Sequence, residues 1–396
     1  MITRTFSPFA MARAGLLALA AFALTACETN MNQVGANTRT VDANAPVKVA
    51  LLVPLNSSQS EMNSLGTSLV NAARMAQNDL SGVQIDLKVY PTGGDPAAAA
   101  AAASRAIAEG AQIFVGPLFS TAAASVAPVA AARGLSVLSF SNNTDIAGNN
   151  VYLLGITFDS VANRVVRHAV ETGRTNIAVI HSNDPAGTAG SDAAKNAIAR
   201  FGGNLAGTWG YDLSPQGISE NAPAIAKAVR AAGANAAVLT DDPGAGLTFL
   251  TPVLASGGLS NRNTQFLGLT RWNQPPAAAT TLSMQDGIFA APDPATLGQF
   301  EARYVATYGA TPHSLAGLAY DGIAAVGAMV QAAQATGSGA LSRSQITDPS
   351  GFAGVNGAFR FLSNGRNERG LALMQLRDGA AVVIDGAPRS FGGQGS

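Results

Sequence analysis

Residues 113–141 read "IFVGPLFSTAAASVAPVAAARGLSVLSFS", and this stretch decides the fold class. Two short apolar runs flank an alanine-rich segment of helical length, which begins near Ser120 and Thr121 and ends in Gly134. Hydroxyl side chains are common where a helix begins, and glycine is common just after its last turn. A continuously apolar strand, a helix and a second such strand are typical of a parallel sheet covered by helices on both faces.

The same alternation of apolar runs and alanine-rich segments extends along most of the chain. Alanine has the highest helix propensity, so even "AAAAAAASRAIAEG" (97–110) is interpreted as a helix. The apolar runs predicted as strands are 47–55, 83–90, 112–118, 135–140, 176–181, 207–213, 235–241 and 264–269. We therefore predict an α/β fold of parallel sheets flanked by helices.

The C-terminal part has a different pattern. Residues 295–309 and 313–335 are predicted to form two consecutive helices. The short runs "GAFRFL", "LALMQL" and "AVVID" follow, with turns at "SNGRNERG" (363–370) and "RDG" (377–379). Short strands joined by tight turns predict a terminal antiparallel hairpin.

Composition excludes several classes of function. Lysine plus arginine and aspartate plus glutamate both number 24, and only 6% of residues are aromatic, so we expect no nucleic-acid partner. The three histidines, His168, His181 and His313, lie far apart, and no metal-ligand spacing, nucleophile elbow or phosphate-binding loop occurs. We therefore expect no enzymatic activity, no cofactor and no metal site.

The N-terminus has the features of an export signal. Residues 1–26 contain Arg4 and Arg13 followed by the apolar run "AGLLALAAFAL", and the only cysteine, Cys27, comes directly after. The stretch "LTACETN" resembles a bacterial lipoprotein signal, which implies cleavage before Cys27 and a lipid on its sulfur; an incidental cysteine after an ordinary secretory signal is the alternative. Residues 27–45 are predicted to be a flexible tether. We expect a protein of the cell envelope that faces the periplasm, and Glu28 after the anchor favours the outer membrane.

Longer motifs, in their order along residues 46–386, carry a family resemblance. They are "VALLVPL" (49–55) with Gly66, Ala73 and Ala76 downstream, the stretch 113–141 quoted above, "TPHSLAGLAYDGIAAVGAMVQA" (311–332), and the closing segment 354–385. The chain resembles the type I periplasmic binding proteins of the leucine/isoleucine/valine-binding group. The resemblance implies two lobes joined by three crossings, with ligand held between them. By analogy, the first lobe comprises 46–157 plus 292–338, and the second comprises 158–291 plus 339–390.

In the first lobe, the resemblance implies ligand contacts in two loops after strands. Ser120 and Thr121 stand where the importer group has hydroxyls that hold an amino-acid carboxylate, although a plain helix N-cap would explain them equally. Asn142 and Asn143 replace the family's small residue and hydroxyl. Asparagine also favours tight turns, so a structural role is the alternative for this pair.

In the second lobe, the expected ammonium-binding acid is missing. The loop after "TQFLGL" carries Arg271 and Trp272, and a guanidinium suits a carboxylate or phosphate rather than an ammonium. The alternative places Arg271 on the surface and packs Trp272 at the edge of the lobe. Asp241 and the neighbouring Asp242 could replace the acid or form a turn, and His181 could reach the mouth of the cleft or be structural.

Two functions follow from the resemblance. The preferred one is a regulator similar to penicillin-binding-protein activator lipoproteins, with a peptidoglycan synthase as partner, because Arg369, Leu371, Gln375 and Gly379 resemble the R-x-L…Q…G ending of activator domains. The alternative is a solute receptor that delivers an amino acid or related small polar molecule to an ABC permease. In the hairpin turn, Arg366, Glu368 and Arg369 form a candidate partner surface, although solvated turns often carry such charges.

Overall fold

The computed structural model describes residues 40–391 and contains two α/β lobes, each built on one main sheet. The first sheet has the strand order β2-β1-β3-β4-β5, and every neighbouring pair is parallel. Its strands are β1 (Val47–Val53), β2 (Ile85–Pro91), β3 (Ile113–Val115), β4 (Val137–Ser139) and β5 (Val151–Leu153). The stretch 113–141 thus forms two adjacent parallel strands and the helix between them, as predicted.

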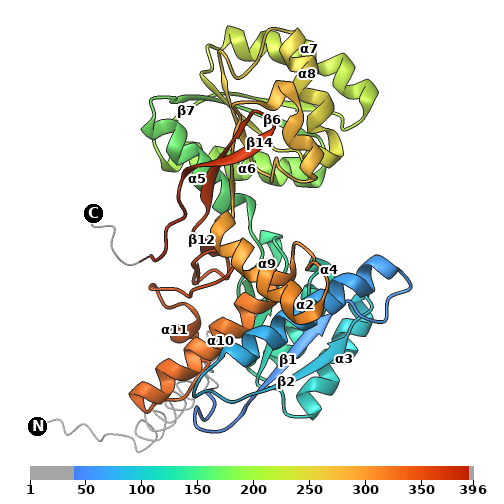
Figure 1. Cartoon of the computed structure of the whole chain (residues 1–396), viewed down its shortest axis with the longest axis vertical. Helices are drawn as coiled ribbons and strands as arrows, with labels where there is room; N and C mark the ends of the chain where they lie inside the picture. The colour runs from blue at the N-terminus through green and yellow to red at the C-terminus, as the bar shows by residue number, and fades with distance from the viewer. Residues whose placement is uncertain (1–39, 392–396) are drawn as a thin grey trace, which may run out of the picture. The chain divides into compact units, whose positions relative to one another are not determined.

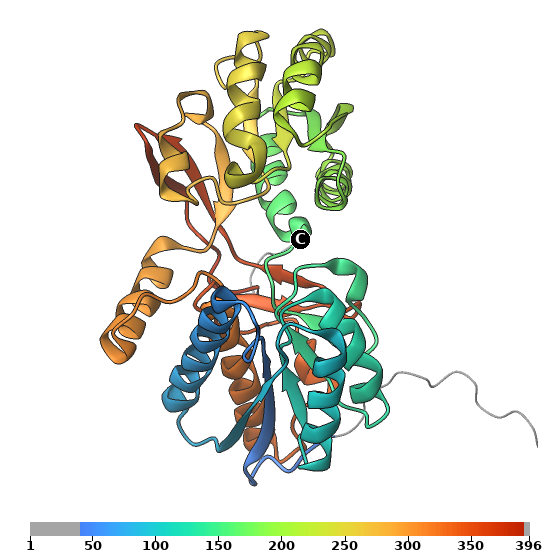
Figure 2. The ribbon, with the colours of Figure 1, turned by 90° about the vertical axis from the view of Figure 1, so that its right-hand side faces the viewer.

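Helices cover both faces of the first sheet. The helices on one face are α2 (Ser60–Asp79) and α10 (Ala316–Thr336), and those on the other are α3 (Pro96–Ala108) and α4 (Ser120–Ala131). Figure 1 shows α2 and α10 running together, and Figure 2 shows α3 and α4, in teal, on the other side of the strands. Both faces of β1 are buried: Val49 and Leu51 enter one core, whereas Ala50 and Leu52 enter the other.

The second sheet has the order β14-β13-β10-β9-β8-β6-β7. Its parallel strands are β6 (Asn176–Ser182), β7 (Asn204–Tyr211), β8 (Ala236–Leu239), β9 (Gln265–Gly268) and β10 (Ile288–Ala291). The helices on one face are α5 (Phe158–Glu171) and α6 (Pro185–Arg200), and those on the other are α7 (Pro215–Ala231) and α8 (Thr248–Ser256). The short strands β5 and β10 were not among the predicted runs.

The C-terminal segment forms two antiparallel hairpins. The first joins β11 (Phe359–Phe361) to β12 (Asn367–Arg369) as a separate two-stranded sheet. β12 lies within "SNGRNERG" (363–370), so only the first part of this predicted turn is a turn. Across "RDG", β13 (Ala372–Arg377) pairs with β14 (Ala380–Asp385), and β13 adds antiparallel to β10 of the second sheet. The predicted terminal hairpin is confirmed, as are the two helices before it, α9 (Pro294–Tyr308) and α10.

Buried polar contacts tie the chain together where it passes between the lobes. The Asn367 side-chain amide donates to the carbonyl oxygens of Leu153 (2.7 Å) and Gly155 (2.8 Å). Arg369 donates to the Leu154 carbonyl (2.9 Å) and forms an ion pair with Asp321 (2.7 Å) in which both side chains are fully buried. The segment after β5 is therefore bonded to the segment before β13.

Packing differs from the predicted lobe limits at two places. Side chains from 341–361, which the prediction assigned to the second lobe, lie in a core of the first lobe: Leu341, Ile346, Phe352, Phe359 and Phe361. The aromatic side chains bring this segment there by packing against one another, with ring centroids 5.5–5.9 Å apart. In the predicted tether, Val41 and Ala43 are buried, and Val41 pairs with Ala340.

The predicted signal, residues 1–26, and the lipid-attachment residue Cys27 lie outside the described residues. Within the described residues, one helix, α10, is long and apolar enough to cross a membrane. Most of α10 is buried against the first sheet and α2, so its apolar composition is accounted for by the core of the lobe.

Candidate functional site

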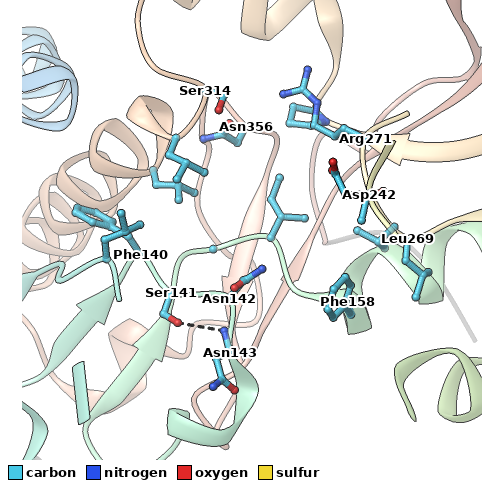
Figure 3. A pocket seen from close by; sticks show the side chains of 18 of the residues that line it. Phe140, Ser141, Asn142, Asn143, Phe158, Asp242, Leu269, Arg271, Ser314 and Asn356 are labelled. Atoms are coloured by element: carbon cyan, nitrogen blue, oxygen red, sulfur yellow. Dashed lines mark hydrogen bonds between the residues drawn. The ribbon is translucent and has the colours of Figure 1, made fainter. Parts of the chain in front are cut away.

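A pocket of about 640 Å³ is lined by both lobes. First-lobe residues come from the segments after β3 and β4 and from around the start of α10, and second-lobe residues come from β10 and from the segments after β8, β9 and β10. Residues within 155–161, after β5, and Asn356 complete the lining. In Figure 3, Ser141 and Asn142 lie on one side of the pocket, with Asp242 and Arg271 on another. The carboxyl ends of parallel strands are where open α/β sheets bind ligands, and this volume suits a small molecule.

Most of the pocket wall is apolar. Phe140 and Leu118 belong to the first lobe, whereas Phe158 and Leu269 belong to the second. The remaining large apolar lining residues are Phe119, Ile156, Val161, Leu315 and Leu318. The described lining contains one arginine, one aspartate and no lysine or histidine. Such a wall suits a ligand with an apolar body and few polar groups.

Ser120 lines the pocket at the first turn of α4, but it is not the helix N-cap. The N-cap position is Phe119, and no side chain caps the helix, so α4 begins with N–H groups that no side chain satisfies. The plain N-cap interpretation of Ser120 is therefore wrong. Thr121 is exposed and is not among the residues that line the pocket.

Asn142 and Asn143 both line the pocket but differ in their bonding. Asn143 Oδ1 accepts a hydrogen bond from the Asp145 amide (3.0 Å) and caps the short 3₁₀ helix Thr144–Ile146, and its own amide donates to Ser141 Oγ (3.1 Å). Among the described residues, none forms a side-chain hydrogen bond with Asn142. The turn interpretation thus holds for Asn143, whereas the Asn142 amide is available to a ligand.

Arg271 is half-buried in the pocket wall, and its charge is unpaired. Its guanidinium forms no hydrogen bond or ion pair with any other described residue, and Nε is buried without an acceptor. Desolvation lowers the pKa of Arg271, and the charge of Glu301 opposes that shift only in part. The alternative that placed Arg271 on the surface does not account for its half-buried position in the pocket wall, and an anion in the pocket would supply its missing partner.

Trp272 does not line the pocket. Its side chain is fully buried in the core of the second lobe, stacked on Phe289 with ring centroids 6.3 Å apart. The indole passes between Gly268 and Gly287, where a Cβ on either glycine would overlap it. The cleft assignment of Trp272 is therefore wrong, because glycines on both sides leave room for the ring inside the lobe.

Asp241 and Asp242 also have separate roles. Asp241 is buried, is not among the pocket residues, and accepts hydrogen bonds from Ser182 Oγ (2.8 Å) and from the Tyr211 hydroxyl. Burial, reinforced by the charge of Asp241, raises the pKa of Tyr211. Asp242 lines the pocket, is exposed, and accepts a hydrogen bond from the Gly244 amide (2.7 Å). Asp241, which follows β8, therefore links the ends of β6 and β7 by hydrogen bonds, and Asp242 is the carboxylate that faces the cavity.

His181 is half-buried at the end of β6 and is not among the pocket residues. Its Nδ1 lies 2.8 Å from the backbone oxygen of Ser182, which is a local structural contact. Among residues 40–391, no group of three or more potential ligands could hold a metal ion.

Sequence reasoning missed several pocket residues. Phe158 follows β5, a strand that was not among the predicted apolar runs. Ser314 and Asn356 come from loops that tertiary packing brings to the pocket. Asn356 also donates to Asp321 (3.1 Å), so the pocket wall is bonded to the buried ion pair between the lobes.

Comparison with known proteins identifies the family. The family model described as "Periplasmic binding protein" matches residues 46–381, so the chain belongs to the periplasmic binding protein family. Together with the two-lobe fold, this confirms a type I periplasmic binding protein related in structure to leucine-binding proteins. No curated protein matches the sequence.

Solved structures show the same fold at low sequence identity. One, from Rhodospirillum rubrum, is assigned to a branched-chain amino acid ABC transporter, with a TM-score of 0.72, 17% identity, and coverage of 86% of this chain and 100% of that one. A leucine-binding protein from Thermotoga maritima has a TM-score of 0.56, 17% identity, and coverage of 85% and 97%. A solute-binding protein of an ABC transporter from Rhodopseudomonas palustris, in complex with 3,4-dihydroxybenzoic acid, has a TM-score of 0.57, 17% identity, and coverage of 87% and 98%.

Proposed function

We propose that this protein is a non-catalytic solute receptor that delivers a small organic molecule to an ABC permease. One observation carries the proposal: both lobes line a single pocket of about 640 Å³ at the carboxyl ends of their strands. Asn142 and the open N-terminus of α4 offer hydrogen-bonding groups from the first lobe, and Arg271 offers a charge from the second. A ligand that contacts both sides would favour a closed arrangement by hinge motion at the crossings.

The comparisons favour this receptor over the activator-like regulator that sequence analysis preferred, because the similar structures named above include ABC transporter solute-binding proteins. The four residues behind the activator resemblance also have internal roles. Arg369 and Leu371 are buried, Gln375 donates to the Asp286 carbonyl (3.0 Å), and the Gly379 amide donates to Gln285 (3.1 Å). Because these contacts account for the motif, it offers little support for a peptidoglycan-synthase partner.

The family supports a location in the cell envelope, on the periplasmic side. A lipid on Cys27 would hold the receptor at a membrane by a short tether, and attachment to the outer membrane is the finer proposal. Labelling cells with a palmitate analogue tests the anchor: the wild-type protein should be labelled, whereas Cys27→Ala should not. Fractionation against membrane markers then distinguishes the outer from the inner membrane.

Thermal unfolding of the purified full chain in detergent tests the receptor function. The ligand panel contains the twenty amino acids, small aromatic and aliphatic carboxylic acids, and muropeptides. A ligand at about one hundred times its dissociation constant stabilises the folded state by about 2.7 kcal/mol. For a chain of this size, the midpoint should rise by about 3 °C. Shifts with amino acids or organic acids support the receptor; a shift with muropeptides alone would favour the activator-like regulator.

A further inference from the structure

Arg271 carries a positive charge in the pocket wall, and this charge has no partner among the described residues. Its Nε is buried without an acceptor, and no described residue forms an ion pair with its guanidinium. Partial burial without a partner costs free energy, and such cost is common at binding sites. A carboxylate would match the planar guanidinium with two parallel hydrogen bonds.

The other residues of the pocket wall limit the charge of the anionic group. Arg271 is the only cationic side chain in the described lining, so a dianionic phosphate would keep one charge uncompensated. Leu269 and Phe158 line the pocket on the same lobe as Arg271, and Phe140 lines it from the first lobe. This arrangement fits one carboxylate attached to an apolar body.

An α-amino acid fits less well. Its ammonium lies close to its own carboxylate, so pairing the carboxylate with Arg271 would bring two positive charges within about 5 Å of each other, where they repel. Asp242 is the carboxylate that faces the cavity, but it is exposed and accepts from the Gly244 amide. Its attraction for a ligand ammonium would therefore be weak, because solvent screens it.

We infer that the pocket takes a small monocarboxylic acid with an apolar body and no ammonium group, its carboxylate paired with Arg271. This inference rests on the proposed receptor function and names its substrate class. The main rival explanation is an ion pair between Arg271 and Glu301 of α9, whose charge acts on Arg271 without a direct contact in this structure. Glu301 is exposed and is not among the pocket residues, so it can be altered separately.

Calorimetric titration of the full chain with matched ligand pairs tests the inference. The pairs are isocaproate with leucine and hydrocinnamate with phenylalanine, which differ only in the ammonium group; hydrocinnamamide removes the charge of the acid. We expect at least one acid to bind about tenfold or more tightly than its amino acid and its amide. Arg271→Gln should weaken that acid by about 10–100-fold, the loss of a charged pair of hydrogen bonds.

Three further variants distinguish a specific pair between Arg271 and the ligand carboxylate from a general effect of charge near the pocket. Arg271→Lys keeps the charge but loses the planar fork, so it should retain part of the affinity. Glu301→Gln should leave the affinity for the acid within about twofold, because Glu301 touches no ligand in this account. Asp242→Asn should raise that affinity, because it removes a negative charge from the pocket wall.

The outcomes distinguish this inference from the receptor function. If leucine or phenylalanine binds more tightly than its acid, or if Arg271→Gln leaves acid binding unchanged, the inference is wrong and the receptor function stands. If Glu301→Gln weakens acid binding as much as Arg271→Gln does, the effect of Arg271 depends on Glu301 and the inference is again wrong. If neither the acids nor the twenty amino acids bind, the receptor function itself fails.

Discussion

Arg271 and Arg369 are two buried or partly buried arginines with opposite surroundings. Arg369 pairs with Asp321 at 2.7 Å, donates to the Leu154 carbonyl, and lies over the ring of Phe359 at 4.6 Å. Arg271 has no partner among the described residues and lines the pocket. Arg369 therefore holds the connection between the lobes, whereas Arg271 is available to bind. The difference shows that the partners of a charged residue, more than its type or burial, indicate its role.

The contrast also corrects the sequence-based view of the hairpin. Arg369 was predicted to lie with Arg366 and Glu368 on a partner surface, but its side chain is fully buried. Glu368 pairs with Arg360 (2.6 Å), and Arg366 pairs with Asp159 (2.9 Å). These contacts place the hairpin charges in the packing around the lobe crossings.

The largest effect is expected when the ion pair loses its acid. Asp321→Asn leaves the Arg369 charge buried without a counter-charge, which should lower the free energy of unfolding by about 3–5 kcal/mol. Urea unfolding at pH 7 measures this change. The double variant Asp321→Leu with Arg369→Met should recover part of the loss, because no charge is then stranded. A loss below about 1 kcal/mol for Asp321→Asn would contradict the structural role assigned to the pair of Arg369 and Asp321.

A smaller effect is expected at the neighbouring amide. Asn367→Ala leaves the carbonyl oxygens of Leu153 and Gly155 without this donor, which should lower the free energy of unfolding by about 1–3 kcal/mol. The same urea measurement applies, with the exposed Asn364→Ala as the turn control. Equal effects of the two variants would show that Asn367 does not hold the crossing.

The smallest effect on stability is expected at the unpaired arginine. Arg271→Gln removes a desolvated charge that no described residue compensates, so stability without ligand should stay within about 1 kcal/mol of wild type and shift upward. Thermal and urea unfolding of the dialysed protein measure it. A marked loss of stability would mean that Arg271 supports the fold as Arg369 does.

Much of the fold was predictable because buried parallel strands are continuously apolar. The runs at 112–118 and 135–140 gave β3 and β4, whereas β5 and β10 were not predicted, although β5 is as long as β3 and β4. Arg271 was found because it follows a strand. Trp272, one residue on, was misplaced because its burial depends on Gly268 and Gly287 and their packing against the indole. Asn356 was missed because tertiary packing alone brings it to the pocket.

The most direct test is one urea-unfolding experiment on wild type and Arg271→Gln, each with and without about 10 mM of the acid, isocaproate or hydrocinnamate, that binds more tightly in the calorimetric titration. We predict that the variant without acid is at least as stable as wild type, and that the acid stabilises wild type alone. If the variant is clearly less stable without acid, or if the acid stabilises both proteins equally, Arg271 is not the carboxylate-binding residue proposed here.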